Sequence, residues 1–235
     1  MNAFEFLVKL SNDNSGFLTL LIFTATVLLG WFTGVFRFLM HQPKFKIEVI
    51  EGPSFCSTYD AMEVESIRGA HRTAIAVYLS ITNIGSAAAE ISQISVAYKS
   101  RAFKNPFKWY WLQNETTFLT DFAVPLGDTY KVVPFMKQQN QLIHNDTSLY
   151  LRAGENRNGI SYFEQEASFG EHYPKDINFY VKIKIMARDS FGHKYYGKSV
   201  IPKVKLAAAQ EWCKKFGLTI QQAKSINKKN FTINE

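Results

Sequence analysis

The sequence is poor in the residues that build covalent or metal-bound frameworks. Cysteine occurs only twice in 235 residues, at Cys56 and Cys213, which excludes a multiple-disulfide scaffold and the paired spacings of a zinc site. A single bridge between these two cysteines stays open for a domain outside the cell. The five histidines are scattered, without a His-x-x-x-His, Cys-x-x-Cys or glutamate-rich cluster. A Walker phosphate loop and a dinucleotide-binding glycine fingerprint are also missing, so we expect no metal, no cofactor and no enzymatic activity.

One short segment, DSFGH at residues 189–193, does bring Asp, Ser and His together. A hydrolytic triad requires the histidine to face the nucleophile and the acid to orient the histidine. A single tight turn rarely provides that geometry, whereas Asp, Ser and Gly are common turn residues. We therefore expect a turn here and no catalytic site.

Charge is missing from one long stretch, Gly16–Phe36, which has 21 residues without a charged side chain. At about 1.5 Å per helical residue this run reaches roughly 30 Å, the thickness of a bilayer's hydrocarbon core. The leader, residues 1–15, is nearly neutral, and no small-residue cleavage pattern follows the run, which argues against a cleaved signal peptide. We predict a single transmembrane helix over residues 16–40.

The charges that flank this run predict its orientation. Lys9 precedes the run, and Arg37, Lys44 and Lys46 follow it. Positive flanks are retained on the cytoplasmic side. We therefore expect a single-pass protein of the cell membrane with its C-terminal domain in the cytoplasm.

Small residues recur every fourth position of the predicted helix, at Thr26, Gly30 and Gly34. Residues at this spacing share one helix face, and small side chains there let two helices approach closely. The pattern predicts a homodimer or a partner contact through the helix, although small residues also reach this spacing by chance.

After Pro43 the apolar residues alternate with polar ones, as in a half-buried strand. The alternation covers residues 45–49, 75–81 and 177–185, and a turn at 189–192 returns the last strand as a hairpin. A slip of the apolar phase near Gln93 indicates a β-bulge. Short strands with spaced turns and no helices between them predict an antiparallel β-sandwich over residues 44–203.

Two further pairs of strands are expected. SLYLRAG and NGISYFEQE should pair across a turn that contains Gly154 and Gly159. TTFLTDFAV and TYKVVPFM are interrupted by Pro125 and Pro134, which places them at sheet edges or ends.

Two stretches, VYLSITNIGSAAAEISQISVAY and LRAGENRNGISYF, resemble strand-and-turn passages of immunoglobulin-like domains in bacterial surface and membrane proteins. The resemblance concerns the fold of residues 44–203 and implies an immunoglobulin-like sandwich. The Cys…Trp…Cys signature of antibody domains is absent, so no immune function is implied.

The C-terminal segment, residues 204–235, returns to a helical pattern and is basic. LAAAQEWCKKF predicts a helix that stops at Gly217, and Thr219 caps a second short helix. EWCKKFGLTIQQAKSI resembles the turn of helix-turn-helix DNA-binding proteins, but a third helix is missing and Ala223 departs from the usual β-branched residue. We expect a helical hairpin packed on the sandwich or on a partner, and nucleic acid is not an expected partner.

The most distinctive polar segment is KSRAFKNPFKWYW, Lys99–Trp111, with four basic and five aromatic residues in thirteen positions. Such a loop suits a membrane surface, because rings prefer the headgroup layer and cations its anionic surface. It equally suits a protein partner, or its rings fill the core. The candidate contact residues are Lys104, Phe107, Lys108, Trp109, Tyr110 and Trp111.

Together these features favour a membrane-anchored, non-enzymatic β-sandwich module for protein–protein interaction or assembly at the membrane. Its expected partners are the lipid bilayer, another protein and a second copy of the chain. One alternative is a membrane-acting effector of a bacterial defence or stress system that works by oligomerisation. Another is a membrane-tethered regulator that binds DNA through the C-terminal helices.

Overall fold

The computed structural model describes residues 15–33, 41–61, 69–113, 115, 122–126, 129–137 and 149–218. The chain divides into two compact units, Met1–Gln42 and Pro43–Glu235.

The first unit contains helix α2, Ser15–Phe32, which has 18 residues and no charged side chain. Most of its described large hydrophobic side chains are exposed, from 38% at Val27 to 83% at Phe32. The helix is about 27 Å long at 1.5 Å per residue. Among the described residues, no helix meets the length and hydropathy that a membrane crossing requires. The predicted transmembrane helix over 16–40 is therefore not supported, and its last part, 34–40, lies outside the described residues.

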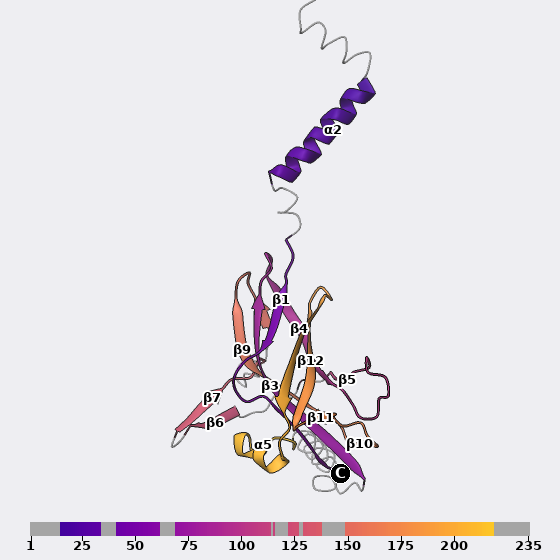
Figure 1. The fold of residues 1–235 in the computed structure, drawn as a ribbon. Helices are drawn as coiled ribbons and strands as arrows, with labels where there is room; N and C mark the ends of the chain where they lie inside the picture. The colour runs from indigo at the N-terminus through magenta and orange to yellow at the C-terminus, as the bar shows by residue number, and fades with distance from the viewer. Residues whose placement is uncertain are drawn as a thin grey trace, which may run out of the picture. The chain divides into compact units, whose positions relative to one another are not determined.

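The second unit contains two antiparallel sheets (Figure 1). The first sheet is organised around the long strand β3, Ala70–Asn83, which pairs along one side with β1 (Phe45–Val49) and β2 (Phe55–Asp60). On its other side β3 pairs with β9 (Asn156–Glu164) and β10 (Ser168–Phe169).

The second sheet is organised around β12, Tyr180–Asp189, which lies between β13 (Lys194–Pro202) and β4 (Ala89–Tyr98). The short strands β5 (Tyr110–Leu112) and β8 (Leu149–Leu151) pair with β4, and β11 (Asp176–Ile177) pairs with β12. The two sheets confirm a mainly β, sandwich-like fold.

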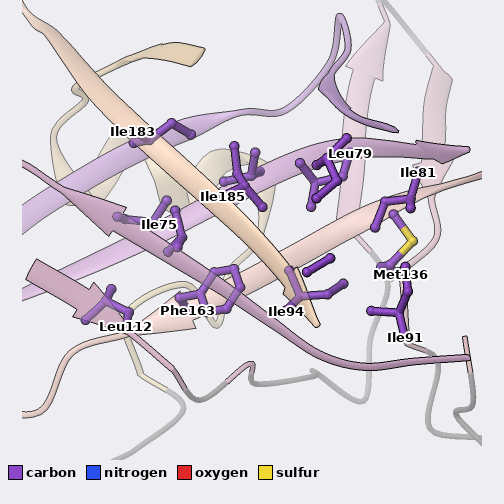
Figure 2. Packing of buried hydrophobic residues seen from close by; sticks show 14 of the residues in the cluster. Ile75, Leu79, Ile81, Ile91, Ile94, Leu112, Met136, Phe163, Ile183 and Ile185 are labelled. Carbon is purple, nitrogen blue, oxygen red and sulfur yellow. The ribbon is translucent and has the colours of Figure 1, made fainter. Parts of the chain in front are cut away.

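The core between the two sheets follows from the alternation in the sequence. Ile75, Leu79 and Ile81 of β3 face Ile183 and Ile185 of β12 in one buried cluster, and Figure 2 shows their side chains meeting between the sheets. Burying this face removes a continuous apolar surface from water, at about 25 cal/mol per Å². The predicted strand phases at 45–49 and 75–81 are confirmed.

The opposite face of the first sheet is also covered, which the sequence pattern did not predict. A second buried cluster joins Phe55 of β2 and Tyr162 of β9 to Phe122 and Phe216. Phe122 belongs to a separate two-stranded ribbon, β6 (Phe122–Leu126) with β7 (Thr129–Val133), and helix α5, Leu206–Trp212, adds Ala209. Strand β3 is therefore buried on both faces.

Several predicted turns and edges are confirmed. The hairpin between β12 and β13 turns at residues 190–193, and the β4–β12 register shifts between Arg188 and Asp189, opposite Gln93 and Ile91. The strands that carry Pro125 and precede Pro134 form the isolated β6–β7 ribbon, as expected for strands with proline at an edge.

Two strand predictions are wrong. The segments around Gly154 and Gly159 do not pair with each other, because β8 joins β4 in the second sheet and β9 joins β3 in the first. Residues 177–185 are not one strand either. Asn178 and Phe179 both have positive φ, 51° and 63°, which makes a two-residue hairpin turn between β11 and β12.

The predicted helix before Gly217 also needs correction, because α5 ends at Trp212 and Cys213 is extended. The ring of Phe216 packs 5.2 Å from both Phe55 and Tyr162, and this burial outweighs helix continuation. Gly217 does have the predicted positive φ, 77°. The predicted second helix from Thr219 lies outside the described residues.

The long strands give the second unit two distinct ends. The Tyr195 hydroxyl donates to the carbonyl of Pro43 and to Asp189 at the last residue of β12. The β4–β5 connection lies at the other end, where Tyr98 pairs with Tyr110 and lies opposite Ile183. We call these the Pro43 end and the loop end, and the ten residues of β12 separate them by about 30 Å.

Candidate contact surface at the loop end

The segment Lys99–Trp111, here the basic aromatic loop, comprises the connection from β4 to β5 and the first two residues of β5. Its tip is a compact turn, in which the backbone N–H of Phe107 donates to Asn105 Oδ1 at 2.8 Å and that of Lys108 to the Asn105 carbonyl at 3.3 Å. Asparagine side chains commonly close such turns on their own backbone. The loop is thus fixed by local bonds.

Lys99 fastens the base of the loop to its tip. Its ammonium donates to the carbonyl of Pro106 and, at 3.4 Å, to that of Lys108, and lies 4.2 Å from the centre of the Trp109 ring. Partial burial and the neighbouring Lys184 and Lys198 lower the pKa of Lys99. Like charges are therefore crowded at this surface.

Tyr110 anchors the returning arm of the loop in the core. Its ring stacks on Tyr98 with centroids 5.3 Å apart, and Gln165 Nε2 donates to its hydroxyl at 3.1 Å. The Tyr98 hydroxyl donates to the carbonyl of His172 at 2.8 Å. Burial raises the pKa of Tyr98 above its ordinary range, so this hydroxyl stays a neutral donor.

The six predicted contact residues divide into two groups. Phe107 is 86% exposed, and Lys104 and Lys108 beside it are also exposed. The other three, Trp109, Tyr110 and Trp111, are half-buried. Packing against the core therefore accounts for the three half-buried rings, two of which lie in β5, but not for the exposed group.

A pocket of about 300 Å³ opens beside the loop. Five lysines line it: Lys99, Lys104, Lys108, Lys175 and Lys182. None of the described residues that line it is acidic. Asp176, the nearest carboxylate in sequence, accepts from Lys203 at 3.1 Å and from Arg101 at 3.4 Å. The hydrogen bond from Lys203 is the main reason that the pKa of Asp176 is lowered.

Sequence reasoning missed Lys175 and Lys182, which are about seventy residues away from the loop along the chain. They reach the pocket because β12 pairs beside β4, and because the turn at Asn178 and Phe179 folds β11 against β12. The sequence signal that could have identified Lys182 is its alternation with Lys184 on the solvent-facing side of β12. An ordinary polar strand face has the same pattern.

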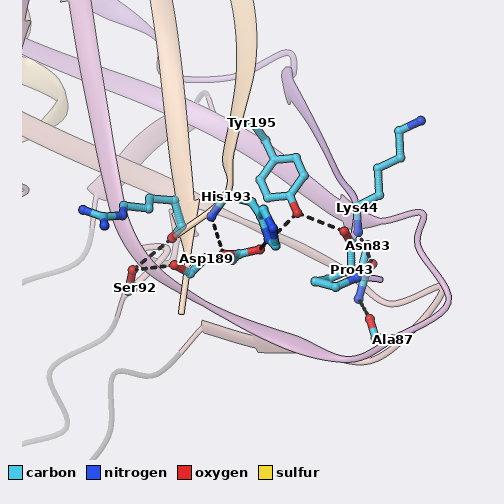
Figure 3. Close-up of polar contacts among 9 residues, drawn as sticks. Pro43, Lys44, Asn83, Ala87, Ser92, Asp189, His193 and Tyr195 are labelled. Carbon is cyan, nitrogen blue, oxygen red and sulfur yellow. Dashed lines mark hydrogen bonds and ion pairs between the residues drawn. The ribbon is translucent and has the colours of Figure 1, made fainter. Parts of the chain in front are cut away.

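The DSFGH segment forms the turn at the Pro43 end, as predicted (Figure 3). The buried Asp189 carboxylate accepts from the His193 backbone N–H at 2.8 Å and from the Tyr195 hydroxyl at 3.0 Å, and His193 Nδ1 lies 3.1 Å away. Burial by itself raises the pKa of Asp189, but these hydrogen bonds outweigh it and lower the pKa overall. The cluster ties the turn to Pro43.

The helix residues predicted to pack against another helix are only partly described. Thr26 and Gly30 lie one turn apart in α2, and the Thr26 hydroxyl donates back to the carbonyl of Ile22 at 2.8 Å. Gly34 lies outside the described residues. Cys56 and Cys213 are free and buried, in the clusters on opposite faces of the first sheet.

No family model matches the chain, and no curated protein matches it. Among solved structures, a Bordetella pertussis protein named ApaA is 10% identical, with 68% of this chain and 94% of that one covered and a TM-score of 0.30. A FixG-related protein from Vibrio parahaemolyticus is 9% identical, with 68% and 95% covered and a TM-score of 0.28. Likenesses this distant carry no argument about function, so what is established for the chain is a mainly β fold of antiparallel sheets.

Proposed function

We propose that this chain is a non-enzymatic, membrane-anchored module whose immunoglobulin-like sandwich holds another protein through the basic aromatic loop. The carrying observation is Phe107, a large ring that is 86% exposed between the exposed Lys104 and Lys108. Aromatic rings that become buried on association dominate the energetics of many protein interfaces.

The internal bonds of the loop support this role. The Asn105 turn and the Lys99 ammonium hold the tip in one shape. A preorganised loop loses less conformational entropy on binding than a flexible one, so more of its contact energy becomes affinity.

The position of the loop favours a protein partner over the bilayer. The chain enters the sandwich at the Pro43 end, and the loop is at the other end, about 30 Å along β12. A module attached through Pro43 can therefore offer the loop to molecules other than the membrane that carries it.

The anchoring part of the proposal rests on the apolar segment 16–40. Its described part, α2, has no charged residue. The hydroxyls of Thr19, Thr24, Thr26 and Thr33 all donate to carbonyls four residues back in the chain, which removes their need for water. The positive flanks place the sandwich in the cytoplasm in this proposal.

Site-specific photocrosslinking in intact cells tests the proposal. A photoreactive phenylalanine analogue replaces Phe107 in the full chain, and in a control chain it replaces Phe191, which is 68% exposed in the turn at the Pro43 end. We expect a discrete crosslinked protein from position 107 and not from position 191. No crosslink at 107, or the same products from both positions, would contradict the proposal.

The two alternative functions depend mainly on other parts of the chain. The oligomerising effector needs the helix face that ends at Gly34, and the DNA-binding regulator needs the helix after Thr219. Both residues lie outside the described residues, so the described residues favour neither alternative.

A further inference from the structure

The pocket beside the basic aromatic loop has a composition that suits a charged ligand. Its volume of about 300 Å³ is at the lower end of small-molecule sites. Lys99, Lys104 and Lys108 come from the loop, Lys175 precedes β11, and Lys182 belongs to β12. Lysines from three segments of the chain thus line one small pocket.

No carboxylate on the described lining balances these charges. The closest one along the chain, Asp176, is already engaged by Lys203 and Arg101. Two further cations on the same sheet, Lys184 and Lys198, act on Lys99. An anion in the pocket would meet five lysines and no carboxylate of the described lining.

The density of charge points to phosphate monoesters. Each monoester carries about −1.5 to −2 at neutral pH, so two or three of them balance the five lysines. A nucleic-acid strand carries one charge per about 3.4 Å and needs about 17 Å to present five. The five lysines line one pocket of about 300 Å³, so a compact ligand with clustered charges matches them better than an extended strand.

The rest of the lining fits a compact, hydroxylated ring that bears these phosphates. Phe103 and Tyr180 provide apolar surface, and Ser100 and Asn105 are polar. The Asn105 side-chain oxygen is held in the loop turn, and the Ser100 hydroxyl donates to the Glu171 carbonyl at 3.0 Å. The side-chain amide N–H groups of Asn105 and the ammonium groups of the lysines are therefore the donors that face the ligand, although Lys99 already donates to the carbonyls of Pro106 and Lys108.

We propose that this pocket binds a small, multiply phosphorylated molecule, either free in solution or as the headgroup of a lipid. The ligand is held by the ammonium groups of the loop, of Lys175 and of Lys182, and it locks the loop against β12. The inference does not depend on the protein contact, because Phe107 does not line the pocket.

Calorimetric titration of the full chain in nonionic detergent tests the site, with inositol 1,4,5-trisphosphate as the soluble probe. We expect saturable binding that Lys182→Glu and Lys175→Glu each weaken by about tenfold or more, because one like charge replaces one attraction. The control is Lys194→Glu, which makes the same charge change at the exposed first residue of β13, next to the turn at the Pro43 end. It should leave the affinity within about twofold, because distant exposed charges are screened.

A second titration separates the two sources of the phosphate group. Dioctanoyl phosphatidylinositol 4,5-bisphosphate replaces the soluble probe, and dioctanoyl phosphatidylcholine serves as its blank. Binding at least about tenfold tighter than the free trisphosphate supports a lipid headgroup, and equal or weaker binding supports a soluble ligand.

Two results would overturn the proposal. One is the absence of binding tighter than about 1 mM to either phosphorylated probe. The other is equal weakening by Lys182→Glu and Lys194→Glu, which would show attraction to net charge and not to the pocket. The Phe107→Ala chain should bind the trisphosphate as tightly as the unmodified chain, so the test is independent of the protein contact.

Discussion

Phe179 occupies a backbone conformation that side chains with a Cβ rarely adopt. Its φ is 63°, and its ring is 76% exposed, so little packing compensates the strain. The turn requires this φ, because β11 and β12 are joined by two residues and Lys203 N–H donates to the Phe179 carbonyl at 2.7 Å. The strained residue thus positions Ile177 and Tyr180, which line the pocket.

The Phe179→Gly substitution should therefore stabilise the domain. Glycine adopts positive φ without a steric penalty, and relief of a left-handed residue is worth about 1 kcal/mol. For a domain of this size we expect the melting temperature to rise by about 2–4 °C, measured by circular dichroism. The control is Phe169→Gly in β10, which removes a comparably exposed ring (61%) and should not raise the melting temperature. A fall in melting temperature for Phe179→Gly would contradict the explanation by backbone strain.

Asp189 makes a pH-dependent contribution at the Pro43 end. Its pKa is lowered in the folded protein from an ordinary value of 3.8, because hydrogen bonds from His193 and Tyr195 outweigh the effect of burial. A lowered carboxyl pKa stabilises the fold fully above the ordinary value, and the stabilisation is lost as pH falls through the folded value.

Asp189→Asn should accordingly be less stable than the unmodified chain at neutral pH, by about 1–3 kcal/mol for a disrupted buried polar group. The stability difference should stay constant down to about pH 5 and shrink below the ordinary pKa of 3.8. Urea unfolding of both chains from neutral pH to about pH 3 measures it. If the stability difference between the two chains grew as the pH fell, the pKa of Asp189 would be raised and not lowered in the folded protein.

At the scale of elements, strand β9 has residues 134–136 in close contact with its backbone. Met136 N–H donates to the carbonyl of Ile160 at 2.8 Å, and Ile160 N–H donates to that of Pro134 at 2.9 Å. A Cβ on Gly159 would lie 2.5 Å from the backbone of Met136. The glycine is therefore a point of close backbone approach and not the turn that the sequence predicted.

Gly159→Ala should destabilise the domain by about 1–3 kcal/mol, because backbone and not a flexible side chain must move. Gly154→Ala is the matched control, since its φ is +79° but nothing lies within 4 Å of an added Cβ; it should lose only about 1 kcal/mol. Urea unfolding compares the two. A larger loss at Gly154 would contradict the packing explanation.

The elements that the sequence predicted well are those with one buried face. Phe45 and Ile47 alternate with exposed lysines because β1 packs only on the inner core. Strand β3 shows alternation in Ile75 to Ile81, yet Ala74 and Ala76 on its other face are buried too, in the cluster that includes residues of the β6–β7 ribbon and of α5. Alanine carries a weak periodic signal, so the second covered face could not be read from the sequence.

The candidate site was only half predictable, for a reason of sequence distance. The loop is one contiguous segment, and its dense basic and aromatic composition is visible without a structure. Lys175 and Lys182 become part of the pocket only through strand pairing. The end of α5 at Trp212 has a similar origin, because Tyr162 and Tyr59 bind the backbone of Gly217 and this tertiary contact overrides helix propensity.

At the scale of the whole molecule, the two units, Met1–Gln42 and Pro43–Glu235, differ in how much of their apolar surface is buried. The sandwich buries its apolar residues in two clusters, whereas α2 exposes nearly all of its own.

The central claim is that the loop end, led by Phe107, is the surface that holds a protein partner. The most direct test is the dissociation constant between the full chain and the protein crosslinked at position 107, measured for the unmodified chain, Phe107→Ala and Phe191→Ala. We expect Phe107→Ala to weaken binding by at least about tenfold, about 1.4 kcal/mol, and Phe191→Ala to leave it unchanged. Equal affinities for the two variants would contradict the claim.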